Sequence, residues 1–405
     1  MHTTADGGAP DQLRGNIRRL YLFSFLKMML FPMAIITLFW KDHIGLSLTD
    51  IMLLQGAFSL ASLCLEYPSG YISDRLGYRF SLNLASALGV AGWAVYTLAG
   101  SFAGVLLAEI MLGISFAFIS GSDSALLFET LRARGKELDY RQHDGAMTAC
   151  AQTGEAVGAL FAGLLYSMAP LLPFFIQIAV WLLALLVTAR LREPEAAPAL
   201  THSHLQEALV TWNLAWRDSP RLRSTILLAT GLGLASFYPV WLIQPYMQQC
   251  GLPLSWFGPV WAGANLTVAL FSVASHKVGI RLGDRGLLLS LLLLTIIGYL
   301  GLGLTGGLFS FLFYYLLTAM RGLQGPFIRQ FLQKESARHN RASLLSLKAL
   351  AFRLGFVVTA PAVGMAADAF GIRATFLLLT PLIAGAALLA AISFVRRNLT
   401  GAPTP

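Results

Sequence analysis

Long apolar runs constrain this chain more than any other feature of its sequence. A helix needs about 20 mostly apolar residues to cross the roughly 30 Å of hydrocarbon in a bilayer. Such runs recur at approximately residues 17–40, 48–69, 80–101, 103–131, 145–168, 171–190, 224–247, 253–275, 287–306, 308–330, 343–367 and 373–395. They predict twelve membrane-spanning helices, and the expected fold class is an all-α integral membrane protein.

The composition excludes a soluble protein of this size. Of the 405 residues, 56% are hydrophobic and only 12% are charged, whereas soluble domains carry about 25% charged residues. The apolar runs contain many glycines and prolines, which bundled membrane helices tolerate because neighbouring helices satisfy the backbone. The three cysteines, Cys64, Cys150 and Cys250, are odd in number and far apart, so no disulfide framework is expected.

The basic residues predict the orientation in the membrane. Most of the 29 lysines and arginines fall in the two tails and in alternate connections between the runs, while Lys41 and Arg373 alone lie in the connections on the opposite face. Because positive charge stays on the cytoplasmic side, both termini are expected in the cytoplasm, and the membrane is expected to be a bacterial inner membrane. The positive charge reflects this topology, so no nucleic-acid partner is expected.

The chain is expected to divide into two six-helix bundles joined by a polar linker. The expected parts are a tail at 1–16, a bundle at 17–190, a linker at 191–223, a second bundle at 224–395 and a tail at 396–405. Leu205, Leu209, Trp212 and Trp216 in the linker recur at helical spacing, which predicts an interfacial amphipathic helix. RLGYR at 75–79 returns as RLGDR at 281–285, and further glycine-containing pairs recur in the same order. They indicate an internal duplication.

The stretch GYISDRLGYR resembles a loop motif of the major facilitator superfamily. In that family the loop between helices two and three reads G-x-x-x-D-[RK]-x-G-[RK]-[RK], and the matching residues here are Gly70, Asp74, Arg75, Gly77 and Arg79. Phe80 departs from the last basic position. The resemblance covers nearly the whole chain and implies the twelve-helix, pseudo-symmetric fold of that family. It also implies a conformational latch, in which Asp74 braces the start of helix eleven and Glu129 joins Arg79.

Ionisable residues inside the predicted spans are the candidates for the transport pathway. An ionisable group there is costly unless it faces a cavity or a partner. In the resembled family, helices 1, 4, 7 and 10 line the central path, flanked by 2, 5, 8 and 11, and all of the charges fall on this set. The predicted substrate and proton pathway is Lys27, Asp123, Glu155, Arg321 and Arg353, with Glu66, Glu109, Lys348, Tyr238 and Trp241 as further cavity or gate residues. Glu66 and Lys348 have an alternative role as snorkelling side chains, and the aromatic residues have one as core or interface residues.

Two departures from the family pattern bear on coupling. Glu109 stands where the span-four motif R-x-x-x-G has arginine, while the arginine version appears at Arg321. The span-five glycine motif of the antiporter branch lacks its Gly-Pro pair. No histidine falls in the middle of a predicted span. Proton coupling is therefore expected to rest on a carboxylate, Asp123 or Glu155, with Lys27 or Arg321 as the modulating cation.

The function predicted from the sequence is secondary active transport by rocker-switch alternating access. No Walker-type phosphate loop is present, and no catalytic residue, metal site or cofactor is expected. Proton-coupled export of a small organic anion, zwitterion or amphiphile is favoured, and proton-coupled uptake of an organic solute is the alternative. A membrane enzyme and a sensor are the disfavoured classes, because GSDS has no partner histidine in the spans and no signalling domain is attached. The expected partners are substrate, protons and lipid, and the expected state is a monomer.

Overall fold

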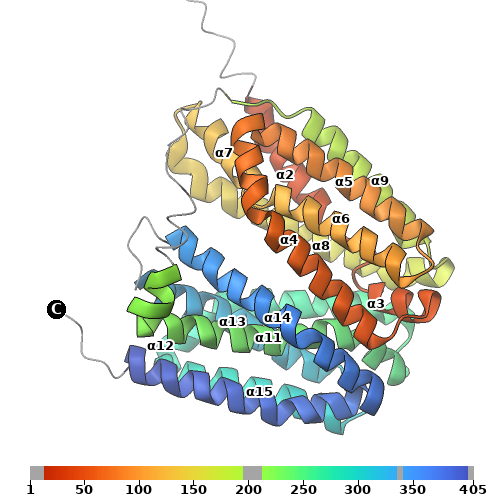
Figure 1. Cartoon of the computed structure of the whole chain (residues 1–405), viewed down its shortest axis with the longest axis vertical. Helices are drawn as coiled ribbons and strands as arrows, with labels where there is room; N and C mark the ends of the chain where they lie inside the picture. The colour runs from red at the N-terminus through yellow and green to blue at the C-terminus, as the bar shows by residue number, and fades with distance from the viewer. Residues whose placement is uncertain (1–12, 195–211, 335–340, 400–405) are drawn as a thin grey trace, which may run out of the picture. The chain divides into compact units, whose positions relative to one another are not determined.

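The computed structural model describes residues 13–194, 212–334 and 341–399. In that part of the chain every regular element is helical (Figure 1). The chain forms two compact units of similar size. The first comprises Met1–Leu46, Ala57–Leu200 and Leu254–Ala262, and the second comprises Ser47–Gly56, Thr201–Pro253 and Gly263–Pro405. Each unit therefore includes one short segment from the other half of the sequence.

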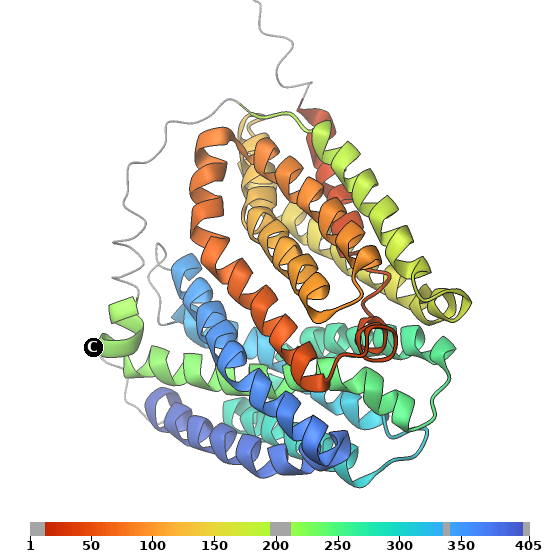
Figure 2. The ribbon, with the colours of Figure 1, turned by 45° about the vertical axis from the view of Figure 1, so that its right-hand side comes forward.

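The first unit is built from the helices of the N-terminal half. They are α2 (Arg14–Met28), α3 (Ile36–Leu38), η1 (Phe39–Ile44), most of α4 (Leu48–Leu76), α5 (Tyr78–Leu98), α6 (Phe102–Ile119), α7 (Ser122–Arg132), η2 (Glu137–Asp139), α8 (Tyr140–Met168) and α9 (Leu172–Ala189). Helix α5 packs against α6 and α9, and α2 packs against α8 (Figures 1 and 2). Small residues allow this approach: a side chain at Gly89 would overlap the ring of Trp181, and one at Gly154 would meet the carbonyl of Phe25.

The second unit is organised around α11. Its elements are η3 (Leu214–Asp218), α11 (Pro220–Gln249), most of α12 (Phe257–Leu304), α13 (Leu312–Lys334), α14 (Arg341–Phe370), α15 (Ile372–Phe394) and η6 (Val395–Leu399), whereas η4 (Leu254–Trp256) belongs to the first unit. Helix α11 contacts α13, α14 and α15. Phe376 of α15 meets Tyr246 and Tyr299 edge-on, with ring centroids 5.9 and 5.7 Å apart.

The two units repeat the same local geometry. Gly77 in RLGYR and Gly283 in RLGDR both have positive φ, 95° and 67°, a conformation that glycine adopts without a Cβ clash. The Ser69 hydroxyl donates to the carbonyl of Ala117 at 2.9 Å, and that of Ser275 donates to the carbonyl of Leu323 at 3.0 Å. Ser275 follows Ser69 by the same number of residues as Gly283 follows Gly77. Equivalent bonds at equivalent positions support the internal duplication.

Eight helices in the described part of the chain are long and apolar enough to cross a membrane. One of them, Leu254–Leu304, covers two predicted spans, because two helices meet there at the non-helical residue Gly283, which has φ of +67°. The three remaining predicted spans are 17–40, 145–168 and 308–330. They fold as α2 with α3, as α8 and as α13. The first is interrupted between Met28 and Ile36 (Figure 2), and the other two carry many polar side chains.

The beginning of the predicted linker packs on the first unit. Asn16, which is fully buried, donates to the carbonyl of Arg192 at 2.7 Å and accepts from its N–H at 3.0 Å. Asn16 therefore lies inside the fold, and α2 begins at Arg14 rather than at residue 17. Most of the predicted interfacial helix falls at 195–211, outside the described residues. At its end, the rings of Trp212 and Trp216 lie 5.6 Å apart.

Candidate functional site

An ion pair joins the two interrupted spans of the first unit. Lys27 Nζ lies 2.5 Å from Asp123 Oδ2. Lys27 is in the last turn of α2, and Asp123 is in the first turn of α7. A helix carries partial positive charge at its N-terminus and partial negative charge at its C-terminus. Each side chain therefore occupies the helix end that favours its own charge.

The local sequence explains why both spans break beside this pair. Gly121 separates α6 from α7 and has φ of +84°, so the helix cannot continue through it. After Met28 the chain runs without regular helix until Ile36, through a segment that contains Pro32. Interrupted helices whose ends face the membrane interior are a recurring device for binding ions and substrates in transporters.

The Lys27–Asp123 pair is largely buried but keeps some exposure to solvent. The two side chains are 15% and 13% exposed. Asp123 Oδ1 also accepts a hydrogen bond from the backbone N–H of Ser124 at 2.7 Å, and the Lys27 ammonium lies 5.7 Å from the centre of the Phe23 ring.

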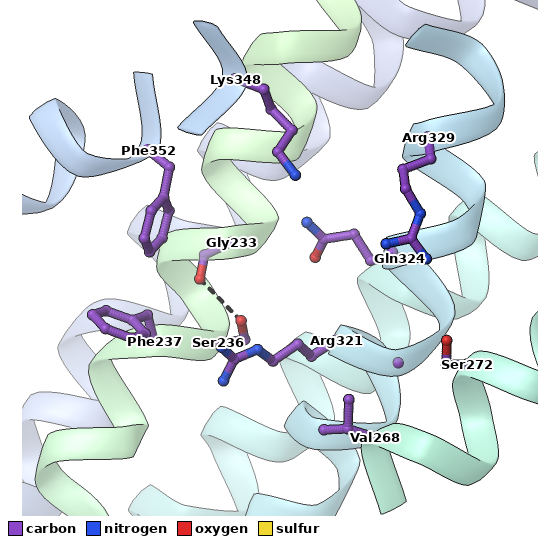
Figure 3. Close-up of a pocket in the computed structure, with 12 residues that line it drawn as sticks. Gly233, Ser236, Phe237, Val268, Ser272, Arg321, Gln324, Arg329, Lys348 and Phe352 are labelled. Carbon is purple, nitrogen blue, oxygen red and sulfur yellow. Dashed lines mark hydrogen bonds between the residues drawn. The ribbon is translucent and has the colours of Figure 1, made fainter. Parts of the chain in front are cut away.

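A second feature is a cavity of about 300 Å³ within the second unit, between α11, α12, α13 and α14 (Figure 3). Three cationic side chains line it, Arg321, Arg329 and Lys348, and none of the described residues that line it is a carboxylate. Gln324 reaches into the same space, between Lys348 and Arg329 (Figure 3). The cavity is therefore strongly electropositive.

Sequence analysis identified two of the three cations and missed Arg329 and Gln324. Both lie on α13 with Arg321, Gln324 three residues after it and Arg329 eight residues after it, so each lies within about 80° of Arg321 around the helix axis. That spacing was the available signal. Arg329 stands near the end of the predicted span, where a basic residue is most simply explained by topology.

The other predicted pathway residues lie outside these two clusters. Glu155 on α8 and Arg353 on α14 are partly exposed, and neither is among the described residues of the Lys27–Asp123 pair or of the cavity lining. Glu66 is partly exposed on α4. Glu109 is buried and accepts a hydrogen bond from the Tyr96 hydroxyl of α5.

Two predicted aromatic residues pack beside the cavity without lining it. The Tyr238 hydroxyl shares a hydrogen bond of 2.6 Å with Thr359, and Trp241 meets Phe237 edge-on at 6.0 Å. Phe237 itself lines the cavity together with Phe352, and their ring centroids are 5.3 Å apart. These two phenylalanines, together with Val268, therefore supply the apolar side chains of the described lining.

The loop motif adopts a tight turn at Gly77 between α4 and α5. Asp74 accepts a hydrogen bond from the Tyr78 hydroxyl at 3.3 Å. The Arg79 guanidinium donates to the carbonyl of Ala189 at 2.9 Å. Glu129 forms its ion pair with Arg132 at 3.6 Å, rather than with Arg79 as the sequence predicted.

The remaining two members of the motif lie on α4 before the turn. The Arg75 guanidinium stacks over the Tyr71 ring at 4.7 Å. Gly70 is helical and has open space around it.

Two carboxylates that the sequence did not single out cap helices. Glu193 accepts from the backbone N–H groups of Tyr78 and Arg79, at 2.9 and 2.7 Å, at the start of α5. In the second unit, Asp368 accepts from the N–H groups of Leu48 and Thr49, at 2.9 and 2.8 Å, at the start of α4. Both satisfy N–H groups that have no partner within their own helix.

The sequence model of the Major Facilitator Superfamily matches residues 20–347 of the chain. The chain belongs to the major facilitator superfamily. It is a multi-pass integral membrane transporter and not an enzyme. The predicted fold class, twelve transmembrane helices in two pseudo-symmetric six-helix bundles, is confirmed.

Relatives within the superfamily are named for different activities. The chain is 23% identical to the uncharacterized MFS-type transporter YxaM of Bacillus subtilis, over 87% of this chain and 90% of that protein. It is 25% identical to raffinose permease of Escherichia coli, over 54% and 52% of the two chains. It is 22% identical to the quinolone resistance protein NorA of Staphylococcus aureus, over 49% and 50%.

A solved superfamily structure supports the same fold. The nucleoside transporter NupG superposes with a TM-score of 0.78 at 14% identity, over 94% of this chain and 99% of that one. At this identity the likeness concerns the fold alone. The substrate has to be inferred from the residues of this chain.

Proposed function

We propose that this superfamily member is a secondary active transporter that exports a small organic molecule in exchange for protons. The Lys27–Asp123 pair at the ends of two interrupted helices carries the proposal. Its carboxylate is shielded, stays within reach of solvent and has one cationic partner. These are the properties of a site that alternates between a proton and a salt bridge.

The proposed cycle couples this pair to alternating access. When Asp123 is ionised, the ion pair ties α2 to α7. Protonation neutralises the carboxylate, so the attraction between the two helices is lost and the relative free energies of the access states change. The loop from Gly70 to Arg79 would act as the cytoplasmic latch, with the membrane being the bacterial inner membrane and both termini cytoplasmic. The protein would act as a monomer.

Export is supported by the relative named for quinolone resistance, which is 22% identical over 49% of this chain. Uptake of an organic solute is the alternative, and the relative named raffinose permease favours it. Both directions use the same proton-linked pair. The direction is therefore tested separately from the coupling.

The coupling test uses everted membrane vesicles energised to a fixed pH gradient, with a fluorescent dye reporting the gradient. Anionic, zwitterionic and cationic amphiphiles are added in turn to vesicles with the wild type, Asp123→Asn and Glu155→Gln. Asp139→Asn is the matched control, because Asp139 is exposed and makes no capping hydrogen bond. We expect some compounds to dissipate the gradient in the wild type and in the control, and the response to be lost in Asp123→Asn.

The other outcomes are equally informative. A response that persists in Asp123→Asn and is lost in Glu155→Gln would move the proton site to α8. A response unchanged in both variants would remove both carboxylates from the coupling. Dissipation that appears only in right-side-out vesicles would support uptake.

A further inference from the structure

We propose that the cavity of the second unit binds the anionic end of the transported molecule, and that this molecule carries at least two negative charges beside an apolar body. This inference names the substrate class of the proposed transporter and rests on that function. It is carried by the charge, the unsatisfied hydrogen bonding and the shape of the cavity, taken in that order.

The charge of the cavity is the first argument. Arg321, Arg329 and Lys348 line a space of about 300 Å³, and the lining residues that the structure describes include no carboxylate. Among the described residues, none of the three forms an ion pair. Neighbouring like charges repel, so grouping these three cations is electrostatically unfavourable unless an anion lies among them. A single negative charge would leave the site with two uncompensated cations, whereas a dianion or trianion would neutralise most of the charge.

The geometry of the donors favours oxyanions. A guanidinium presents paired N–H groups that match a phosphate or carboxylate, and an ammonium adds a point charge. The Lys348 ammonium points toward the Gln324 amide, the Arg329 guanidinium lies on the other side of Gln324, and Arg321 extends toward Ser236 below them (Figure 3). A phosphate group or two adjacent carboxylates offer enough oxygen atoms for such a set of donors.

Gln324 adds a second requirement. Its amide nitrogen donates to the carbonyl of Ala229 at 3.2 Å, while its amide oxygen is buried and has no hydrogen-bond partner in the described part of the chain. An unsatisfied buried acceptor is costly unless a ligand or water supplies a donor. The substrate is therefore expected to carry a hydroxyl or N–H group close to its anionic end.

The phenylalanines define the other end of the substrate. Phe237 and Phe352 lie at one side of the cavity in an edge-to-face arrangement, at an interplanar angle of 77°. Such rings bind planar or aliphatic groups by stacking and by apolar burial. The ligand class that fits all of these features is a small phosphorylated or polycarboxylated organic molecule with an aromatic or apolar body.

The test measures binding to the purified full-length protein in detergent by isothermal titration calorimetry. The probes share a benzene ring and differ in charge: phenyl phosphate, phthalate, benzoate, benzyl alcohol and benzyltrimethylammonium. We expect phenyl phosphate and phthalate to bind at least about tenfold more tightly than benzoate, and the other two not to bind measurably. Comparing phenyl phosphate with phthalate distinguishes a phosphate site from a dicarboxylate site.

Three variants connect the binding to the cavity. Arg321→Gln and Lys348→Gln should each weaken binding of the preferred dianion about tenfold or more, because each removes a charged hydrogen-bond donor. Lys277→Gln, which removes an exposed cation outside this cavity, should leave the affinity unchanged. Thermal unfolding of each variant verifies that it is folded.

The inference is overturned if the benzyltrimethylammonium cation binds more tightly than the dianions, if folded wild type binds none of the anions, or if neither cavity variant weakens their binding. Its failure can be told apart from failure of proton-coupled export. Dianion binding that depends on the cavity, without proton movement in vesicles, sustains the cavity assignment and contradicts the coupling. Proton movement evoked by cations, without anion binding, does the reverse.

Discussion

At the scale of single residues, the Lys27–Asp123 pair shows how backbone and side chain reinforce each other. Gly121 ends one helix so that Asp123 can begin the next, and the break after Met28 leaves Lys27 at a helix end. The dipole of each half-helix then stabilises the charge that it faces. A pair held in this way tolerates burial better than two charges in the middle of intact helices would.

The pair also makes a thermodynamic prediction. Lys27→Met and Asp123→Asn should each lower the thermal unfolding temperature in detergent, because each leaves one shielded group without its partner. The double variant should recover most of this loss, since no charge remains unpaired. The expected coupling energy is about 1–3 kcal/mol. Strictly additive losses in the double variant would show that the pair contributes nothing to stability.

The individual members of the pair could be predicted from sequence, but their contact could not. Both residues are ionisable groups within apolar runs, which is sufficient to flag them. Their meeting depends on two helix interruptions. The stretch FISGSDSALLF that contains the second reads as a continuous apolar span with a few small polar residues. Arg329 and Gln324 were missed for another reason. They lie toward the end of a predicted span, where polar and basic residues are usually explained by membrane topology rather than by a cavity.

At the scale of helices, capping carboxylates fix the ends of the spans. Asp368 satisfies two backbone N–H groups at the start of α4, and the Thr49 hydroxyl donates to it at 2.5 Å. Glu193 performs the same role at the start of α5. In sequence, Glu193 belongs to a Pro/Ala-rich stretch that resembles a linker, so its capping role depends on a fold that brings residue 193 back to residue 78.

Removing the cap on α4 should destabilise the protein. Asp368→Ala should cost about 1–3 kcal/mol, because it removes the charged acceptor of two backbone N–H groups and of the Thr49 hydroxyl. Asp139→Ala is the matched control, because Asp139 precedes α8 without capping it. Thermal unfolding in detergent, followed by tryptophan fluorescence, should therefore show a lower midpoint for Asp368→Ala alone. Equal midpoints for the two variants would refute the capping role.

The two glycines of the loop motif should respond differently to substitution. Gly77 has φ of +95°, and a Cβ there would lie 2.9 Å from Cδ of Glu193. Gly77→Ala should therefore cost about 1–2 kcal/mol in strain. Gly70 is helical with open space around it, so Gly70→Ala should be neutral or slightly stabilising. Expression level and thermal unfolding of the two variants measure the difference, and equal loss in both would contradict the strain argument.

At the scale of the whole molecule, the sequence predicts most of the architecture because a bilayer demands so much of each span. The twelve apolar runs, the two bundles and the repeated glycine turns all follow from local patterns. The two short segments that group with the unit of the other sequence half do not follow from local patterns. That residues 47–56 group with the second unit and residues 254–262 with the first depends on long-range packing that leaves no local signature.

The proposed orientation of the protein in the membrane gives a prediction for the whole molecule. Cys250 follows α11 in a connection that the charge pattern places outside the cell, and it is a partly exposed free thiol. With Cys64 and Cys150 changed to alanine, a membrane-impermeant maleimide should label intact spheroplasts at Cys250. A cysteine placed at exposed Ala133, with Cys250 also removed, should react only in everted vesicles. The reverse pattern would invert the proposed topology.

The confinement of the three cavity cations to α13 and α14 has a consequence for how such a protein evolves. On the proposed division of roles, the residues that bind the substrate are encoded in one half of the gene. The residues that couple transport to the proton gradient are encoded in the other half. Mutations around Arg321 and Lys348 can then change what is carried while the energy-harnessing half remains under unchanged selection. A lineage built in this way can gain new cargoes in small, viable steps.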